Sequence, residues 1–398
     1  MSSSEAYTAA PVNGTDIQTF VDEIFSPFHR AEQRRWAQAY LWALAHLSGR
    51  KTPQNMARAA ALPTAAAHGL RQFVTASPWD WEPVRHRLAL RVTANAAPYA
   101  WTVAELVIPK RGEHSVGVHR RRDATTGRTL NCQRAMGLFL STDTHAFPVD
   151  WSLVLGGPWG SDPERRRRAR IPETETGQPA GAHVLDFAAD VAARPRLPRA
   201  PWVLDLTRSD EAGGLLAGLA RQRLDVVCEV DADQLVLAGR RAPLVSTVGE
   251  LMNVRHARQT HVMIRQTADG GAKAAPVHTY ATTVRLPMLG ARDELDSPRY
   301  RILERPAPDG RQRTRYWITT LTSTRVDEVL RLVRGHIAAR ATVDALQKRY
   351  GVLDFEGRSF PGWHRHMTMA SAAYVYQHLP GAPGTASAAP AELTEAAS

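Results

Sequence analysis

Residues 100–118, AWTVAELVIPKRGEHSVGV, decide the fold of this chain. The apolar run over residues 100–108 predicts a buried β-strand. The basic turn after it predicts a hairpin whose second strand begins at residue 114. Glu105, next to Ala104, is the one ionisable side chain of the first strand. A single hairpin is not stable alone, so further strands and helices must cover it.

Strand-like and helical patterns on both sides of this hairpin predict a mixed α/β sheet with flanking helices. Strand-like runs, read as a meander, cover residues 100–108, 114–120, 130–142 and 148–155. A basic segment, 161–172, separates them from alternating helices and strands at 181–194, 201–207, 211–224 and 225–230. Upstream of the sheet, residues 17–95 have helical spacing, with a break predicted over 77–92.

These changes of pattern divide the chain into six parts. We expect a disordered N-terminus (1–16), a helical domain (17–97), the first part of the sheet domain (98–234), an inserted mainly-β subdomain (235–315), the C-terminal part of the sheet domain (316–378) and a disordered tail (379–398). A chain of 398 residues is longer than one domain usually needs, which agrees with such a division.

The composition indicates a polyanionic partner. Lys and Arg number 50 against 39 Asp and Glu, which gives a net charge of +11. The two cysteines, Cys132 and Cys228, lie in apolar runs and fit neither a disulfide framework nor a zinc pattern. The chain shows no secretory signal and no apolar run near the ~20 residues that cross a membrane, so we expect a cytoplasmic protein.

Basic side chains that could contact phosphates gather in three regions: the predicted hairpin, the arginine run and a C-terminal segment. They are Lys110, Arg111, His114, Arg120, Arg121, Arg122, Arg165, Arg166, Arg167, Arg168, Arg358, His364 and Arg365. A solvated helix end, balanced by Asp162 and Glu164, explains the arginine run equally well. The pair His364 and His366 has a spacing seen in metal sites, but no third ligand accompanies it.

Asp205 ends the apolar run WVLD, where open α/β sheets place their functional sites. A turn or helix-capping role is the alternative for a lone aspartate at this place.

Several stretches together resemble the insertion-sequence-701 type of DDE transposases. In family order from about residue 18 to 378, they read RAEQRRWAQAYLWALA, QFVTASPWDWEPVRHRLALRV, IPKRGEHSVGV, NCQRAMGLFLSTD, FPVDWSLVL, WGSDPERRRRARIP, PWVLDLT and LDFEGRSFPGWHRHMTM. The resemblance implies a ribonuclease-H-like catalytic domain. It also implies DNA strand transfer by two metal ions that three carboxylates hold.

In this family register only one of the three carboxylates is present. The first position falls on Ala104, with Glu105 beside it, the second on Asp205 and the third on Arg340. Rescue would need Glu105, which should point to the opposite face of its strand, or Asp344, one helical turn beyond Arg340. We expect Arg340 to form an ion pair with Asp205 that fills the empty pocket, and we expect no metal or other cofactor.

The leading hypothesis is therefore a transposase-derived, catalytically inactive and sequence-specific binder of double-stranded DNA. We expect a domesticated regulator that associates with the nucleoid and not with a membrane, and a homodimer is left open. One alternative is an active transposase that uses displaced carboxylates with Mg²⁺ or Mn²⁺. The other alternative is a non-enzymatic scaffold for protein interactions.

Overall fold

The structure, a computed structural model, describes residues 14–122, 127, 129–207, 212–239, 243–266, 272–287, 298–307 and 313–379. The tail predicted to be disordered lies outside these residues, apart from residue 379. The predicted disordered N-terminus also lies outside them, except for its last three residues, which begin the first helix. No helix in the described part of the chain is both long and apolar enough to cross a membrane.

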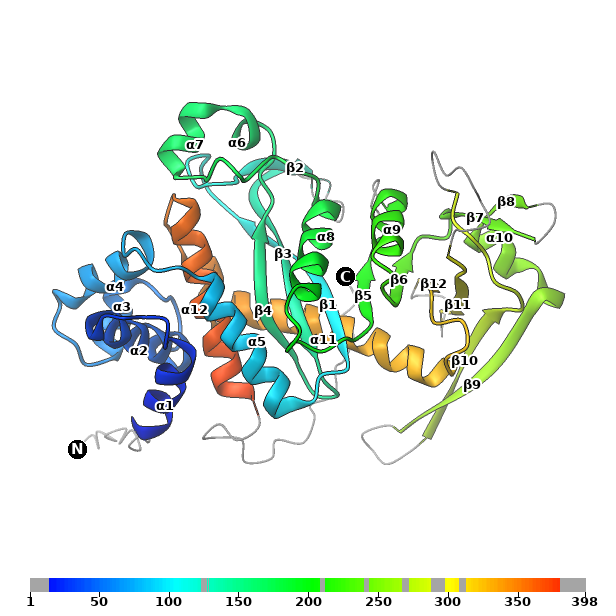
Figure 1. Cartoon of the computed structure of the whole chain (residues 1–398), viewed down its shortest axis with the longest axis horizontal. Helices are drawn as coiled ribbons and strands as arrows, with labels where there is room; N and C mark the ends of the chain where they lie inside the picture. Colours follow the sequence, from blue (N-terminus) through cyan, green and yellow to red (C-terminus); the bar gives the residue numbers. More distant parts are fainter. Residues whose placement is uncertain are drawn as a thin grey trace, which may run out of the picture.

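Five helices lie on the N-terminal side of the chain, and the first four of them form one end of the molecule (Figure 1). The five are α1 (Gly14–Ile24), α2 (Ala31–His46), α3 (Pro53–Ala59), α4 (Ala66–Thr75) and α5 (Glu82–Ala96). The break predicted over 77–92 is wrong for most of its length. Pro83 lies in the first turn of α5, where its missing N–H has no partner to lose, so it starts this helix.

A mixed sheet forms the centre, as the sequence predicted. Its first six strands are β1 (Ala100–Pro109), β2 (His119–Arg122), β3 (Thr129–Ser141), β4 (Ala146–Leu153), β5 (Trp202–Asp205) and β6 (Val226–Val230). β3 lies antiparallel between β1 and β4, while β5 and β6 continue parallel to β1 on its other edge. The strand order β4-β3-β1-β5-β6 gives this sheet the ribonuclease-H-like arrangement that the resemblance implies.

The predicted first hairpin is wrong in one respect. Residues 114–118 form a turn, and the antiparallel partner of β1 is β3, with β2 on the far edge of β3. Gly117 has a φ of 75°, in the left-handed region, which interrupts an extended strand. β3 also offers ten residues in register with β1, from Cys132 to Ser141, which the seven-residue run 114–120 could not. For the same reason the four runs do not form a simple meander.

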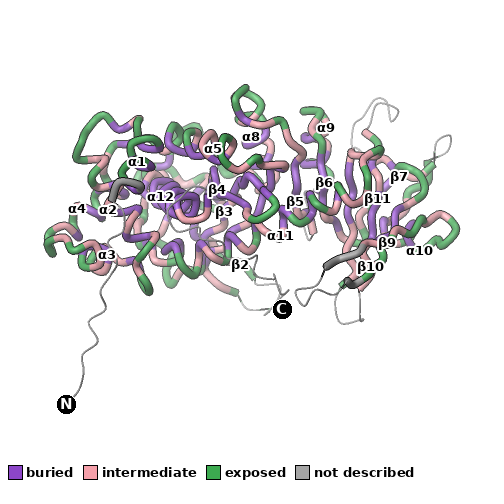
Figure 2. The backbone as a smooth tube through the Cα atoms, turned by 90° about the horizontal axis from the view of Figure 1, so that it is seen from below, coloured by how far each residue is buried: buried purple, intermediate pink, exposed green. Residues whose placement is uncertain are grey.

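Helices cover both faces of the sheet (Figure 1). α8 (Ala180–Ala192) and α9 (Ala212–Arg221) follow β4 and β5, and α11 (Val326–Arg349) crosses the other face. α12 (Phe360–His378) lies between the sheet and the N-terminal helices and is buried on nearly all sides (Figure 2). The predicted basic segment forms the short helices α6 (Pro158–Ser161) and α7 (Pro163–Ala169).

The described residues between 235 and 315 are mainly extended, with a short α-helix followed by a turn of 3-10 helix. β7 (Leu235–Ala238) and β8 (Leu244–Thr247) pair with each other and precede α10 (Val248–Asn253). β9 (Arg258–Gln266), β10 (Ala272–Tyr280) and β11 (Arg301–Arg305) lengthen the main sheet through β12 (Arg315–Thr319). The predicted division into domains stays a prediction.

Candidate functional site

Asp205 lies at the carboxyl end of β5, and both of its carboxylate oxygens lie near polar groups of the protein. Its Oδ1 accepts hydrogen bonds from the Thr207 backbone N–H at 2.9 Å and from the Thr207 hydroxyl at 2.6 Å. Its Oδ2 faces His336 Nε2 at 3.7 Å and Arg340 Nη1 at 4.0 Å, both from α11. The site is therefore a carboxylate held between a turn of its own chain and two basic side chains.

This environment favours the ionised carboxylate. Burial alone would raise the pKa of Asp205, but His336 and the two Thr207 donors outweigh it and hold that pKa well below its usual range. The 3.7 Å between His336 Nε2 and Asp205 Oδ2 exceeds a hydrogen-bond distance, so the attraction is electrostatic rather than a formed bond. Asp205 is thus an anion that lies beside an imidazole and a guanidinium of its own protein.

Ala104 stands beside Asp205 in the sheet. Thr102 on β1 pairs with Val203 on β5, so two residues farther along both strands Ala104 comes level with Asp205. Ala104 is only 3% exposed, and on its other side it pairs with Gly137 of β3. A Cβ on Gly137 would lie 2.6 Å from the ring of Trp151, so bulky apolar side chains already fill that space. The position that the resemblance gives to the first metal ligand therefore holds a methyl group in a tightly packed surface.

α11 crosses the face of the sheet on which Ala104 and Asp205 lie, and it runs in the direction of β1. At its middle, Gly335 approaches Thr102, and farther along Gln347 donates a hydrogen bond to the Val107 carbonyl at 2.9 Å. Between these two contacts, the helical rise places Arg340 about level with Ala104. Asp344 is exposed and lies about 6 Å farther along the helix. The structure therefore brings Arg340 to Asp205 and leaves Asp344 beyond them.

The predicted ion pair between Arg340 and Asp205 is present at the long limit of 4.0 Å, but Arg340 does not fill the pocket. Its side chain is 67% exposed, whereas the His336 side chain is 5% exposed and occupies the space next to the carboxylate. Sequence reasoning missed His336. Its position four residues before Arg340, on the same helical stripe, was the available signal.

Glu105 lies on the opposite face of the sheet from Asp205. Strand alternation directs it away from Ala104, and it forms ion pairs with Arg121 of β2 and Arg134 of β3. The structure therefore does not bring Glu105 to the candidate metal site. These contacts also engage Arg121, one of the predicted DNA-contacting residues, within the protein.

The described residues around Asp205 do not fit a pair of Mg²⁺ ions. Such ions need several oxygen ligands each, and two-metal sites use carboxylates that bridge or flank both ions. Here the neighbours of Asp205 are a hydroxyl, an imidazole and a guanidinium. No group of three or more His, Cys, Asp or Glu side chains suited to a metal ion occurs within the described residues.

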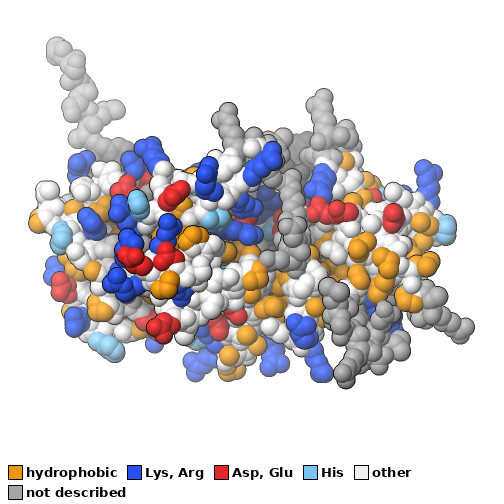
Figure 3. All heavy atoms as spheres, turned by 90° about the horizontal axis from the view of Figure 1, so that it is seen from above, with side chains coloured by type: hydrophobic (Ala, Val, Ile, Leu, Met, Phe, Trp, Pro, Cys, Tyr) orange, Lys and Arg blue, Asp and Glu red, His pale blue; other side chains and the backbone are white. Residues whose placement is uncertain are grey.

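Seven of the predicted DNA-contacting side chains are exposed. They are Arg111, His114, Arg120, Arg122, Arg167, Arg168 and Arg358. Figure 3, seen from the side of α6, α7 and β2, shows Lys and Arg in several groups across this face, with fewer acidic side chains between them. Arg165 and Arg168 also pair with Asp162 and Glu164, so part of the arginine run is balanced locally.

The prediction that His364 and Arg365 contact DNA is wrong. Both are buried in α12, at 5% and 7% exposure, because this helix is surrounded by the sheet and the N-terminal helices. Burial holds the pKa of His364 well below its usual range, so the ring is neutral at pH 7. Arg365 donates from Nε to the Trp79 carbonyl at 2.9 Å.

Two further candidates are held by main-chain carbonyls. Lys110 donates to the Phe355 carbonyl at 2.7 Å, and burial lowers the pKa of its ammonium. Arg166 bonds to the carbonyls of Trp159, Pro172 and Glu175, so it fixes the loop after α7. These two side chains therefore stabilise the fold next to the exposed arginines.

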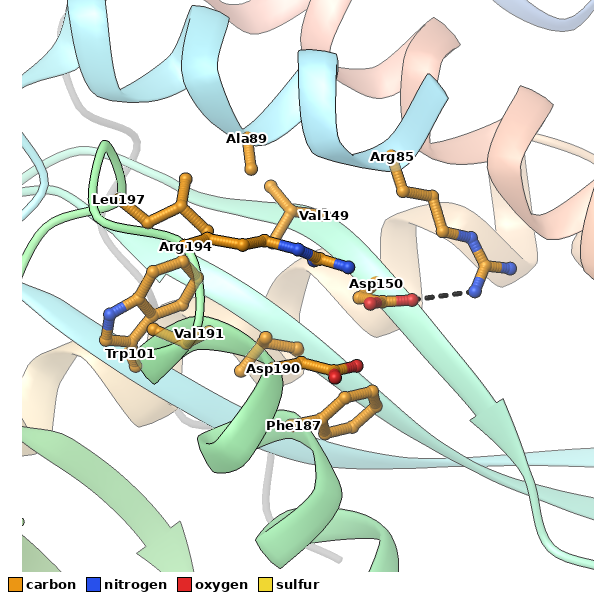
Figure 4. Close-up of a pocket in the computed structure, with 11 residues that line it drawn as sticks. Arg85, Ala89, Trp101, Val149, Asp150, Phe187, Asp190, Val191, Arg194 and Leu197 are labelled. Carbon is orange, nitrogen blue, oxygen red and sulfur yellow. Dashed lines mark hydrogen bonds and ion pairs between the residues drawn. The ribbon is translucent and has the colours of Figure 1, made fainter. Parts of the chain in front are cut away.

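A cavity between α5, α8 and the sheet is too small for a substrate. Its volume is about 10 Å³, room for one water molecule, and Arg85, Asp150, Asp190 and Arg194 lie around it (Figure 4). Arg85 Nη1 bonds to Asp150 Oδ1 at 2.7 Å. The cavity is therefore a small gap between packed elements and not a binding site.

Comparison with protein families agrees with this fold. The model of a family described as DDE superfamily endonuclease matches residues 23–268, which include Ala104 and Asp205 but not α11. No curated protein matches the chain. The matched region contains most of the sheet and spans more than half of the sequence. The chain belongs to the DDE superfamily of endonucleases.

Proposed function

We propose that this chain is a transposase-derived protein that binds double-stranded DNA without cutting it, and that it works without a metal cofactor. The observation that carries the proposal is the contact of Asp205 with His336 and with Arg340, which stands at the position that the resemblance gives to the third carboxylate. Binding at chosen sites on the chromosome would make the protein a domesticated, nucleoid-associated regulator.

The charge balance at the site argues against metal binding. An arginine stays protonated at any physiological pH, so Arg340 cannot give way to a dication as a carboxylic acid or histidine could. Two unit charges 4 Å apart interact by about 1 kcal/mol in water and by about 4 kcal/mol at an effective dielectric constant near 20. Because Arg340 is 67% exposed, a dication beside it would meet a repulsion between these limits. Ala104 adds no oxygen that could compensate.

A basic face, formed by the exposed Arg111, Arg120, Arg122, Arg167 and Arg168, supports DNA as the partner. Arg111, Arg120 and Arg122 lie around the outer edge of β3, and Arg167 and Arg168 extend the positive charge onto α7. Arginine is suited to phosphate because its planar fork can donate two hydrogen bonds at once. DDE endonucleases act on DNA, so the loss of cleavage chemistry leaves this surface as the retained function.

Purified full-length protein tests both halves of the proposal. We expect a fluorescent duplex to be bound at 50 mM salt, and supercoiled plasmid to stay unnicked in Mg²⁺ or Mn²⁺. Nicking that Asp205→Ala abolishes would overturn the inactivity and favour an active transposase. If no duplex is bound even at low salt, the DNA-binding half is wrong and a protein scaffold gains support.

A reconstituted variant serves as the positive control for metal binding. In Ala104→Asp/Arg340→Glu, two carboxylates return to the places that face Asp205. We expect millimolar Mn²⁺ to raise the melting temperature of this double variant and not that of the parent chain, because only the variant binds the ion in its folded state. An equal rise in the parent chain would show that its present residues hold the metal.

A further inference from the structure

A second cavity lies between the first half of α11 and the strands β9, β10 and β11 (Figure 1). Its volume is about 80 Å³, against about 10 Å³ for the cavity beside Arg85. An engineered protein cavity of about 150 Å³ accepts benzene, whereas one water molecule needs roughly 10–15 Å³. The space therefore suits a small aliphatic group of about three or four carbons.

Two regular elements supply apolar walls to this cavity. On α11, Leu330, Val333 and Ile337 follow one another at three- and four-residue spacing, so they face the same way. On the sheet, Met263 of β9 pairs with Ala275 of β10. Because Ala275 offers only a methyl group, the sheet wall stays recessed at this point. The walls are therefore a helix face and a sheet face that do not fill the space between them.

Two arginines line the same cavity. Arg334 is exposed on α11, and Arg305 is the last residue of β11. His278 pairs with Glu304 in antiparallel register, so Val277 and Arg305, one residue along each strand, also come opposite each other. Residues that lie opposite each other point to the same face of a sheet, and here that face is the one toward α11. The cavity thus combines apolar walls with positive charge.

None of the described residues that line the cavity is acidic. Glu304 points to the other face of its strand and forms an ion pair with Arg258. Asp143, an acid within electrostatic reach of Arg334, already accepts two hydrogen bonds from Arg331, at 2.7 and 2.6 Å. The charge of Arg334 can therefore bind an anion that comes from outside the chain.

We propose that this cavity binds a branched aliphatic carboxylic acid of about five or six carbons, with its alkyl group between α11 and β10 and its carboxylate at Arg334. The planar fork of an arginine matches a carboxylate with two parallel hydrogen bonds. A phosphate of the DNA backbone does not fit, because it brings no apolar group that could fill the cavity. The site therefore goes beyond the proposed DNA binding and does not depend on it.

A ligand-observed NMR titration of the full-length protein with isocaproate, a branched six-carbon acid, tests the assignment. We expect saturable binding with a dissociation constant on the order of 1 mM, which is typical of so small a ligand. Isocaproamide has nearly the same shape without the charge and should bind about fivefold more weakly or worse, because the charge-assisted hydrogen bonds are lost. Acetate has the charge without the branched chain and should show no saturable binding.

Two variants locate the binding within the protein. Arg334→Gln should weaken the binding of isocaproate about fivefold or more, because it removes the charge at the cavity. Ala275→Leu adds three carbons to the sheet wall and should abolish the binding. The matched control is Arg349→Gln, which removes an exposed arginine from the other end of α11 and should leave the affinity unchanged. Circular dichroism shows that each variant compared is folded.

The assignment is wrong if isocaproate and its amide bind equally well, or if Arg334→Gln binds as tightly as Arg349→Gln. Binding that survives in folded Ala275→Leu, or that is absent in the parent chain up to about 10 mM ligand, contradicts it as well. If Ala275→Leu does not fold, the amide and Arg334→Gln still decide. Since no DNA is present in these titrations, their failure leaves the proposed DNA binding untouched.

Discussion

Asp205 combines the roles of a functional position and a structural one. Its Oδ1 closes a turn with Thr207, and its Oδ2 lies opposite His336 and Arg340. In a working metal site the same oxygens would face metal ions. In this structure the oxygens face partners within the protein, so the anion contributes to folding stability.

The sequence register could predict much of this site. It identified Asp205, Ala104 and the approach of Arg340, because β-strand order and helical spacing constrain where each residue lies. It could not predict that His336 fills the pocket, since the choice between two residues one turn apart depends on how α11 is rotated against β1. That rotation follows from contacts such as Gly335 against Ser141, which belong to tertiary packing.

Asp205→Asn should destabilise the protein at neutral pH and much less in acid. The folded-state pKa of Asp205 is depressed, so its stabilisation is complete above the unfolded-state pKa of about 4 and is lost as the pH falls toward the folded-state pKa. We expect a loss of about 1–3 kcal/mol in the free energy of unfolding at pH 7, shrinking progressively below pH 4.

Urea unfolding at a series of pH values measures this difference directly. Asp344→Asn is the control, because Asp344 is an exposed residue on the same helix as the partners of Asp205. A constant difference between the parent chain and Asp205→Asn across the acid range would mean that the carboxylate charge plays no part in stability.

Among the elements, α5, β4 and α12 are joined by one buried polar network. Arg85 of α5 is 3% exposed and bonds to Asp150 and the Trp151 carbonyl on β4. It also donates to the Thr368 hydroxyl and the His364 carbonyl on α12. Every side of the guanidinium thus fixes the N-terminal helices to the sheet.

Sequence patterns predicted most elements of the sheet but not this junction. A strand or an amphipathic helix shows its period in the sequence, whereas a helix that is buried all round has no polar face to reveal which side is inside. α12 is such a helix, and for that reason its His364 and Arg365 were taken for surface residues. α5 was missed because residues 77–92 were interpreted as a break, although Pro83 among them lies in the first turn of the helix.

Arg85→Ala should lower the free energy of unfolding by about 3–5 kcal/mol, because it leaves Asp150 and several buried acceptors without their partner. Arg87→Ala, two residues along the same helix but exposed, should change it by less than about 0.5 kcal/mol. Chemical denaturation followed by circular dichroism compares the two variants. Equal effects would show that the buried network does not hold the helices and the sheet together.

On the scale of the whole molecule, positive charge and apolar packing occupy different regions. The core runs through the sheet, α11 and α12 (Figure 2), while β2 and α7 carry the exposed Arg120, Arg122, Arg167 and Arg168. The composition alone predicted a polyanionic partner from the charge of +11. It could not show which arginines are free for that partner, because pairing with Glu105, Asp162 or main-chain carbonyls depends on the folded structure.

The salt dependence of DNA binding should report how many of these arginines contact phosphates. Each phosphate contact adds about 0.9 to the negative slope of the logarithm of the association constant against the logarithm of salt concentration. Arg111→Ala/Arg120→Ala should therefore make the slope shallower by about two, with a scrambled duplex as the ligand. Both residues are exposed beside the edge of β3.

The matched control is Arg87→Ala/Arg221→Ala, which removes the same charge from exposed positions on α5 and α9 and should leave the slope nearly unchanged. Fluorescence anisotropy between 50 and about 200 mM salt gives both slopes. Equal reductions in the two variants would mean that net charge, and not this face, determines the binding.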